Sequence, residues 1–271
     1  MTRRDFAGKV VVITGAAGGL GWALAGAFAA AGARVAALDF DAAGAEVLAG
    51  ELRTEGRQAL ALACDVTDAT ACEGAIAAVL ASWGRIDVLI NNAGITHRSA
   101  WKRTDPAVTR RVMDVNFFGS VHCTRAALDA LLASRGLIIV ISSVAGFAPL
   151  IARTGYAAAK HALHGFFDSL RSELANERVG VLMVCPSFIA TGIDRNALGG
   201  DGAPVRHAQQ IVGVRARAED VAAQVLRAAQ NGKQLLLPGR TAKLAWWVSR
   251  LAPRYYARVM VRRLRAEMDG E

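Results

Sequence analysis

The sequence Lys9-Val-Val-Val-Ile-Thr14-Gly15-Ala-Ala-Gly-Gly-Leu-Gly21 decides the fold of this 271-residue chain. Its first half is a β-branched apolar run typical of a buried strand, and the alanine-rich stretch that continues to about Ala31 predicts a helix. Glycines between strand and helix let the backbone turn tightly and approach a ligand closely. The free N–H groups of the helix start suit a pyrophosphate. The candidate contacts in this loop are Gly15, Ala17, Gly18, Gly19, Leu20 and Gly21.

A second strand, predicted over residues 33–39, ends in an acid eighteen residues after Gly21. A carboxylate at Asp39 suits hydrogen bonds to both hydroxyls of an adenosine ribose, whereas a 2′-phosphate there would meet like charge. The glycine loop holds no Lys or Arg, and Asp39 is followed by Phe40 and Asp41. This pattern favours NAD over NADP as the cofactor. The alternative is that Asp39 only caps the following helix.

Strand and helix patterns alternate along the rest of the chain. Further strands are predicted at 58–64, 86–90, 136–143, 180–185 and 234–237. Helices are predicted at about 42–55, 68–82 and 218–231 and around Tyr156, and two helical stretches fill about 105–134 with Asn116 between them. Alternation of this kind predicts an α/β fold, a doubly wound parallel sheet of about seven strands in a single domain.

A tyrosine and a lysine stand four residues apart in Tyr156-Ala-Ala-Ala-Lys160, which places them one turn apart on one helix face. A phenol loses its proton near pH ~10, and an ammonium beside it favours the phenolate, so the pair suits acid/base chemistry near neutrality. The preceding strand would deliver Ser143 to the carboxyl edge of the sheet, where ligands bind. Alone, the pair is a weak signal, because a first-turn aromatic and a solvated surface lysine give the same spacing by chance.

Together the motifs resemble those of the short-chain dehydrogenase/reductase family over about residues 7–238. They stand in the family's order: Thr14-Gly-x-x-x-Gly19-x-Gly21, Asp39, Asp65, Asn91-Asn-Ala-Gly94, Asn116, Ser143, Tyr156-x-x-x-Lys160, and Pro186 with Thr191. The resemblance implies a Rossmann-type fold and hydride transfer between a nicotinamide and an alcohol or carbonyl carbon. One departure is Ser187 after Pro186, where the family usually has Gly.

The resemblance also implies a catalytic tetrad. Tyr156 would exchange a proton with the substrate oxygen, and Ser143 would hydrogen-bond that oxygen. Lys160 would lower the pKa of Tyr156 and bind the nicotinamide ribose, while Asn116 would hold a water. For the cofactor, Asp65 and Val66 would flank the adenine, Asn91, Ala93 and Gly94 would line the adenosine side, and Pro186, Ile189 and Thr191 would surround the carboxamide.

Composition excludes several classes of protein. No run of 18 or more apolar residues predicts a transmembrane helix, and the N-terminus lacks the apolar segment of a signal peptide. The cysteines Cys64, Cys72, Cys123 and Cys185 form no CxxC pair, so we expect buried thiols in a reducing cytoplasm and no metal. The net charge is +9, but no recognised nucleic-acid-binding motif occurs.

Much of the positive charge lies at the C-terminus, where residues 232–271 hold nine Lys and Arg against three acids. We divide the chain into a catalytic domain, residues 1–238, and a basic amphipathic helical extension, residues 239–271. The extension predicts a helix over 240–267 that breaks at Pro253. Its apolar stripe is Leu244, Trp247, Val248, Leu251, Tyr255 and Val259, and its basic stripe is Lys243, Arg250, Arg254, Arg258, Arg262 and Arg265.

Two interpretations of the extension remain open. The stripes and aromatic residues resemble a helix that lies peripherally in a membrane interface. Alternatively, the helix packs on its own domain or on a sister subunit, because family members usually form homodimers or homotetramers.

The substrate is predicted from apolar residues that would border the site. They are Phe188, Ile189, Ile193, Leu198, Ile211, Val212 and Val214, together with Val144, Ala145, Phe147 and Leu150. They favour a lipophilic secondary alcohol or ketone, such as a steroid-like, terpenoid or acyl-chain compound, unless they only pack a lid. A different function class is a catalytically silent nucleotide-binding sensor or scaffold, which the complete tetrad disfavours.

Overall fold

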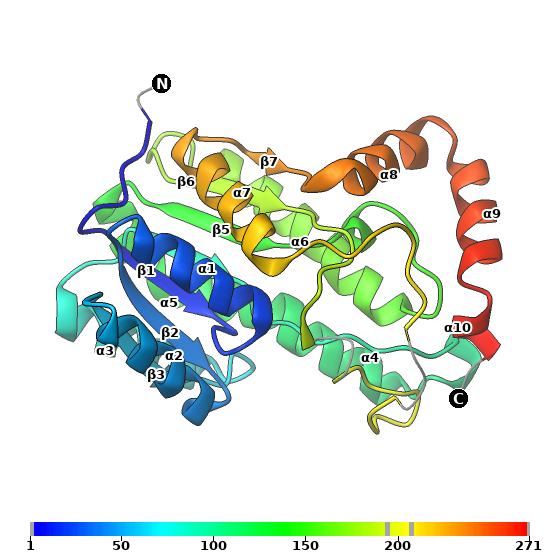
Figure 1. Cartoon of the computed structure of the whole chain (residues 1–271), viewed down its shortest axis with the longest axis horizontal. Coiled ribbons are helices and arrows are strands. Elements are labelled where there is room, and N and C mark those ends of the chain that lie inside the picture. The colour runs from blue at the N-terminus through cyan, green and yellow to red at the C-terminus, as the bar shows by residue number, and fades with distance from the viewer. Residues whose placement is uncertain (1–2, 193–195, 206–208, 270–271) are drawn as a thin grey trace.

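One sheet of seven parallel strands runs through the computed structural model, which describes residues 3–192, 196–205 and 209–269 (Figure 1). The strands are β1 (Val10–Thr14), β2 (Arg34–Asp39), β3 (Ala59–Ala63), β4 (Val88–Asn91), β5 (Leu137–Ile141), β6 (Gly180–Val184) and β7 (Leu235–Leu236). Their order is β3-β2-β1-β4-β5-β6-β7, and every neighbouring pair is parallel. The predicted doubly wound sheet is therefore confirmed.

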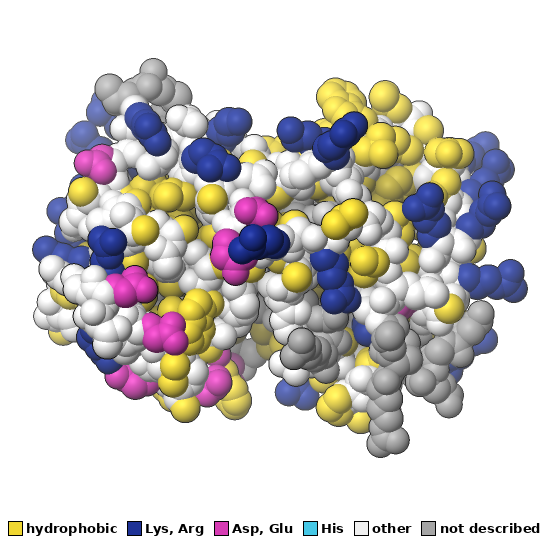
Figure 2. Space-filling model, viewed as in Figure 1, with side chains coloured by type: hydrophobic (Ala, Val, Ile, Leu, Met, Phe, Trp, Pro, Cys, Tyr) yellow, Lys and Arg dark blue, Asp and Glu magenta, His cyan; other side chains and the backbone are white. Residues whose placement is uncertain are grey.

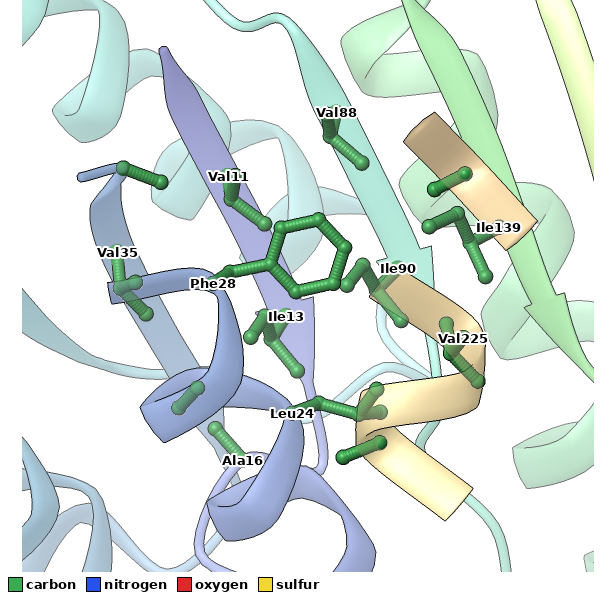
Figure 3. Close-up of a cluster of buried hydrophobic side chains, with 14 of the residues drawn as sticks. Val11, Ile13, Ala16, Leu24, Phe28, Val35, Val88, Ile90, Ile139 and Val225 are labelled. Carbon is green, nitrogen blue, oxygen red and sulfur yellow. The ribbon is translucent and has the colours of Figure 1, made fainter. Parts of the chain in front are cut away.

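Helices cover both faces of the sheet. On one face lie α1 (Gly19–Ala30), α2 (Ala42–Thr54) and α7 (Ala218–Gln230), and on the other lie α3 (Ala69–Trp83), α5 (Gly119–Ser134) and α6 (Thr154–Glu173). Figure 3 shows the first core, where Phe28 of α1 and Val225 of α7 meet strand residues such as Ile13. Burial of each such large side chain stabilises the fold by ~1.5–3 kcal/mol. A second core of the same kind lies on the other face, under α3, α5 and α6.

The position of the site follows from the strand order. From β1 the chain moves outward to β2 and β3, and then returns to β4 on the other side of β1. Crossovers that run in opposite directions leave a crevice at the carboxyl ends of the two central strands. The glycine loop after β1 and the Asn91–Gly94 turn at the end of β4 both lie at this edge.

The two helical stretches predicted over 105–134, with Asn116 between them, are joined by an irregular turn. The stretch begins as α4 (Pro106–Met113), widens into a π-helical turn (Asp114–Phe118), and continues as α5 without a break. Asn116 lies in the middle of this turn and is fully buried. Turns of this kind occur often at functional sites, because the widened backbone redirects a side chain.

The C-terminal segment forms three helices, α8 (Gly239–Leu251), α9 (Pro253–Arg263) and α10 (Ala266–Asp269), so the break predicted at Pro253 is confirmed. In Figure 1, α8 follows β7, α9 descends along one end of the molecule, and α10 returns toward the segment after β4. No helix of the described chain is both long and apolar enough to cross a membrane.

The buried face of these helices differs from the apolar stripe that the sequence suggests. Tyr256, Met260 and Leu264 pack with Ala148 in a small core of their own. By contrast, Leu244, Trp247, Leu251 and Tyr255 of the predicted stripe are each at least 60% exposed. The periodicity detects an amphipathic helix, but it does not reveal which apolar residues meet the domain.

Candidate active site

The glycine loop is held against the turn that ends β4. Asn92 Nδ2 donates to the carbonyls of Thr14 and Gly15 at 3.0 and 2.9 Å. Gly15 has a positive φ of 63°, and a Cβ added there would lie 2.7 Å from Ala93 Cα. Only glycine therefore allows the two turns to approach this closely.

The start of α1 is suited to bind the pyrophosphate that the glycine-rich sequence predicts. Gly18 is the N-cap, and among the described residues no side chain caps this helix. The first-turn N–H groups are therefore left without a capping side chain, which suits pyrophosphate binding. A Cβ added to Gly19 would lie 3.3 Å from Thr191 Cβ, so Thr191 borders the same loop.

Asp39 is fixed by the loop rather than by the helix that follows. Its Oδ2 accepts from Ala17 N at 2.8 Å, and its Oδ1 accepts from Asp41 N at 2.9 Å. The residue that caps α2 is Asp41, which accepts from Gly44 N at 3.0 Å. Phe40 is 81% exposed beside it. The carboxylate therefore stands at the end of β2, next to the glycine loop.

The other predicted cofactor contacts follow the carboxyl ends of β3, β4 and β6. Asp65 accepts from Thr67, and Val66 is buried, with its carbonyl 3.0 Å from His122 Nδ1. Asn91 directs its amide into the core, donating to Thr124 Oγ1 at 2.9 Å. After β6, Pro186 accepts from Val144 N, and Ile189 pairs with Ala216 in an isolated bridge. Each residue thus lies near the crevice edge, although Asn91 is turned inward.

The four predicted tetrad residues are brought together. Asn116 Oδ1 accepts from Ile95 N at 2.8 Å, and its Nδ2 donates to Ile95 O at 2.8 Å. A Cβ added to Gly94 would lie 2.7 Å from Asn116 Oδ1 and 3.6 Å from Lys160 Nζ. Because residue 94 is a glycine, the side chains of Asn116 and Lys160 both fit against its Cα.

Lys160 is almost fully buried and lies under the tyrosine. Its Nζ donates to Ile141 O at 2.8 Å and lies 5.6 Å from the centroid of the Tyr156 ring. Burial lowers the pKa of Lys160 to about 8, so the ammonium still predominates at neutral pH. The Ser143 side chain interacts with the Tyr156 hydroxyl and lowers its pKa. A proton on Tyr156 is thus next to a second hydroxyl and close to a cation.

Burial and neighbouring groups act on the pKa of Tyr156 in opposite directions. Burial raises the pKa of Tyr156, and two effects oppose it: the hydrogen bond with Ser143 and the positive charge of Arg153. Lys160, which the resemblance credits with lowering the Tyr156 pKa, lies with its ammonium over the Tyr156 ring and donates to a main-chain carbonyl of β5.

Sequence reasoning missed several charged and titratable residues close to the tetrad. His97 is fully buried and accepts from Gly155 N at 3.0 Å through Nε2; burial and the charge of Arg153 lower its pKa to about 4. Arg98 and Arg153 are also buried, and both pair with Glu267 of α10. Single residues in loops have neither periodicity nor motif spacing, so no sequence signal selects them.

Some apolar residues assigned to the substrate have neighbours within the chain. Val144, Phe147, Leu150 and Val212 pack against the core around Tyr256 and Met260. Ile211 and Val214 are exposed, by 38% and 84%. Ile193 lies outside the described residues. The C-terminal helices therefore cover part of the surface that the sequence assigns to the substrate.

With this geometry established, comparison with known proteins identifies the family. The family described as short chain dehydrogenase matches residues 9–200. The chain belongs to this family of oxidoreductases. The resemblance inferred from the motifs is thereby confirmed.

Related proteins align with nearly the whole chain. Dehydrogenase/reductase SDR family member 7B of Bos taurus is 38% identical over 270 residues, covering 97% of this chain and 83% of the relative. Dehydrogenase/reductase SDR family protein 7-like of Anopheles gambiae is 36% identical over 267 residues, covering 96% and 84%. These alignments include most of the C-terminal helices.

Solved structures agree on the fold. A short-chain dehydrogenase from Streptomyces avermitilis superposes with a TM-score of 0.81 at 27% identity, covering 92% of this chain and 94% of its own. A short chain dehydrogenase/reductase from Burkholderia phymatum, solved in complex with NAD, gives a TM-score of 0.83 at 24% identity, covering 93% and 96%.

Proposed function

We propose that this protein is an NAD-dependent oxidoreductase that interconverts a secondary alcohol and a ketone. The observation that carries the proposal is the convergence of Asn116, Ser143, Tyr156 and Lys160 at the sheet edge that also holds the glycine loop. A silent sensor or scaffold has no need of such a converged set. Membership of an oxidoreductase family supports the same conclusion.

Side chains of the protein would transfer the proton. The bound nicotinamide supplies or accepts the hydride. Tyr156 would give its proton to the substrate oxygen during reduction and take it back during oxidation, and Ser143 would hydrogen-bond that oxygen. Lys160 would add positive charge beneath the phenol and reach the ribose. Asn116 would hold the backbone at Ile95, next to the water it is predicted to bind.

The residues of the crevice fit a dinucleotide. The glycine loop and the first turn of α1 would hold the pyrophosphate, and Asp65, Val66 and the Asn91–Gly94 turn would border the adenosine. Thr191 and Ile189 would contact the carboxamide. NAD is preferred over NADP in this proposal, because the Asp39 carboxylate stands where a 2′-phosphate would bring further negative charge.

We propose a lipophilic substrate. Apolar side chains from two segments lie on the carboxyl side of the sheet, and Ile211 and Val214 expose theirs. Exposed apolar side chains in the segment that is predicted to cover the site favour a substrate with an apolar body and one polar group, the reacting oxygen. A steroid-like, terpenoid or acyl-chain alcohol or ketone has this form.

A turnover screen tests the activity. Ketones and secondary alcohols of increasing apolar size are incubated with NAD(H) and NADP(H) side by side, and oxidation or reduction of the cofactor is followed. We expect turnover with NAD(H), with kcat/KM rising as the substrate becomes more apolar. NADH binding without turnover on any compound would instead favour the sensor function.

We also propose that the C-terminal helices contact an anionic membrane surface. Leu244, Trp247, Leu251 and Tyr255 form an exposed apolar strip on α8 and the start of α9. Figure 2 shows hydrophobic side chains gathered over α8, bordered by Lys and Arg. No acid occurs from residue 239 to residue 266, and the following Glu267 is buried. An apolar strip with basic borders complements an interface of anionic lipid.

Vesicle co-sedimentation tests this contact. Phosphatidylcholine vesicles containing phosphatidylserine should bind the protein, and binding should weaken with salt. Replacing Trp247 and Leu251 by Ser should abolish binding, whereas Val47→Ser, which changes an exposed apolar residue of α2, should not. If the double variant binds vesicles normally but dissociates the proposed homo-oligomer in sedimentation velocity, the strip is a subunit interface.

A further inference from the structure

The first turn of α6 carries Tyr156 and depends on hydrogen-bond acceptors from outside the helix. Its N-cap is Arg153, and a guanidinium has no acceptor atom with which to cap a helix. The first hydrogen bond within the helix runs from Ala157 N to Arg153 O at 2.8 Å, so the N–H groups before Ala157 need other partners. One of these N–H groups belongs to Gly155, the residue directly before Tyr156.

His97 supplies the acceptor for Gly155. Its Nε2 accepts from Gly155 N at 3.0 Å, although the two residues lie 58 positions apart, and both are buried. A Cβ added to Gly155 would lie 3.2 Å from this nitrogen and 3.1 Å from Thr109 Oγ1, so the imidazole comes this close because residue 155 is a glycine. Nε2 accepts only from a neutral ring, and burial and the charge of Arg153 lower the pKa of His97 to about 4, which keeps the ring neutral near pH 7.

The backbone that carries His97 is itself fixed on both sides. Two residues before it, Ile95 is held by Asn116 through two hydrogen bonds of 2.8 Å. Two residues after it, Ser99 N donates to Ala152 O at 3.0 Å, just before α6 begins. This short segment therefore connects Asn116 with the start of α6, and the His97 side chain is the point where it contacts the helix itself.

The same segment also pairs with the loop that follows β6. Arg98 N donates to Leu198 O at 2.8 Å, Leu198 N donates to Thr96 O at 2.9 Å, and His97 and Leu198 form an isolated parallel bridge. These bonds use main-chain atoms alone. A substitution of the His97 side chain therefore removes the contact with α6 and keeps the atoms that hold the segment in place.

We propose that His97 is a positioning residue, which accepts from Gly155 N and thereby fixes the first turn of α6, and with it Tyr156, relative to Asn116. The proposal rests on the proposed function. To exchange a proton, the Tyr156 hydroxyl must lie within hydrogen-bonding distance of the substrate oxygen, and a displacement of about 1 Å lowers a rate by as much as ~10²-fold. Without the Nε2 acceptor, a buried N–H loses its partner, and the start of the helix would shift toward another one.

Two substitutions of His97 separate the acceptor from the space that the ring fills. His97→Met fills the space without an acceptor for Gly155 N, whereas His97→Gln keeps one in its amide oxygen. On a substrate found in the turnover screen, kcat of His97→Met should fall by about tenfold or more, while NADH affinity measured by titration stays within about twofold. His97→Gln should recover most of this loss. His161→Met, which replaces an exposed histidine of the same helix, is the matched control and should keep the kcat of the wild type.

A second control separates positioning from stability. Val225→Ala creates a cavity in the core on the other face of the sheet, so it destabilises the fold away from α6 and should keep its kcat at a temperature where it stays folded. A loss of kcat in Val225→Ala as large as that in His97→Met would show that kcat only follows stability, and would overturn the proposal. An unchanged kcat in His97→Met, or equal losses in the Met and Gln variants, would overturn it as well.

The Tyr156 ring gives a reading that needs no substrate. The chain has three tyrosines, so the ring-carbon NMR signals of ¹³C-labelled tyrosine can be assigned with single Tyr→Phe variants. The Tyr156 signal should move in His97→Met and keep its wild-type position in His97→Gln. Gly155→Ala, whose Cβ would press on His97 Nε2, should move the signal too and replaces His97→Met if that variant does not fold.

The NMR reading also separates this proposal from the proposed function. A Tyr156 signal that stays in place in His97→Met and Gly155→Ala would overturn the positioning role, whatever the turnover. A signal that moves as expected, in a protein that turns over none of the compounds, would overturn the proposed function and leave the positioning of Tyr156 by His97 standing.

Discussion

Tyr156 lies between opposing influences. Burial favours the protonated phenol, while the Ser143 hydroxyl and the Arg153 charge favour the phenolate. The same guanidinium acts on His97, which is neutral because it is buried and accepts a backbone hydrogen bond. The positive charge of Arg153 thus lowers the pKa of both Tyr156 and His97, although Arg153 belongs to none of the family motifs.

His97 gives a stability prediction. Its pKa of about 4 in the folded protein lies below the unfolded value of about 6.5. Between these values the unfolded chain binds a proton that the folded protein does not. The contribution of neutral His97 to the free energy of unfolding is therefore complete above pH ~6.5. It is lost as the pH falls toward ~4, at up to about 1.4 kcal/mol per pH unit.

Urea unfolding across this pH range measures the effect. In His97→Gln, where the amide oxygen can still accept from Gly155 N, the acid-induced fall in the free energy of unfolding should be shallower than in the wild type. An identical pH slope in both proteins would show that His97 is not the group responsible.

Asp39 gives a specificity prediction. Replacing it by Ser removes the charge that would oppose a 2′-phosphate, so the ratio of kcat/KM for NADPH to that for NADH should rise by roughly tenfold or more, equivalent to about 1.4 kcal/mol. Asp41→Ser, which alters the cap of α2 instead, is the control and should change this ratio little. An unchanged ratio in Asp39→Ser would place the cofactor's ribose elsewhere.

At the scale of elements, α1 and the β4 turn set the shape of the crevice. A Cβ added to Gly21 would lie 2.8 Å from Ala16 Cα and closer still to the Gly15 carbonyl, whereas Gly26 of the same helix has open space around it. The helix therefore needs glycine at its start for close packing, but not in its middle.

This contrast predicts opposite effects of one substitution. Gly21→Ala should destabilise the protein by about 1–3 kcal/mol through overpacking, and should weaken NADH binding by distorting the loop. Gly26→Ala should leave binding unchanged and stabilise the helix by up to about 1 kcal/mol. Thermal unfolding and NADH titration of both variants check this, and equal effects at the two sites would contradict the crevice geometry.

Over the whole molecule, the sequence predicted those features that leave a periodic or motif signal. Buried apolar runs such as residues 9–14 mark the strands, and the helix break at Pro253 follows from a residue that cannot continue a helix. The sequence predicted a division of the 105–134 helical stretch at Asn116, but not its π-helical form, because one inserted residue barely alters the apolar pattern. The ion pairs of Glu267 were missed as well: Arg98 lies 169 positions away, and nothing in the spacing of single charges reports a contact over that distance.

The central claim is that Tyr156 carries the proton for hydride transfer at a nicotinamide, and Tyr156→Phe tests it most directly. The variant keeps the ring and removes only the hydroxyl. On a substrate found in the turnover screen, its kcat should fall by at least ~10²-fold, while NADH affinity, measured separately by titration, should change little. Full turnover by Tyr156→Phe, with NADH bound normally, would contradict the account.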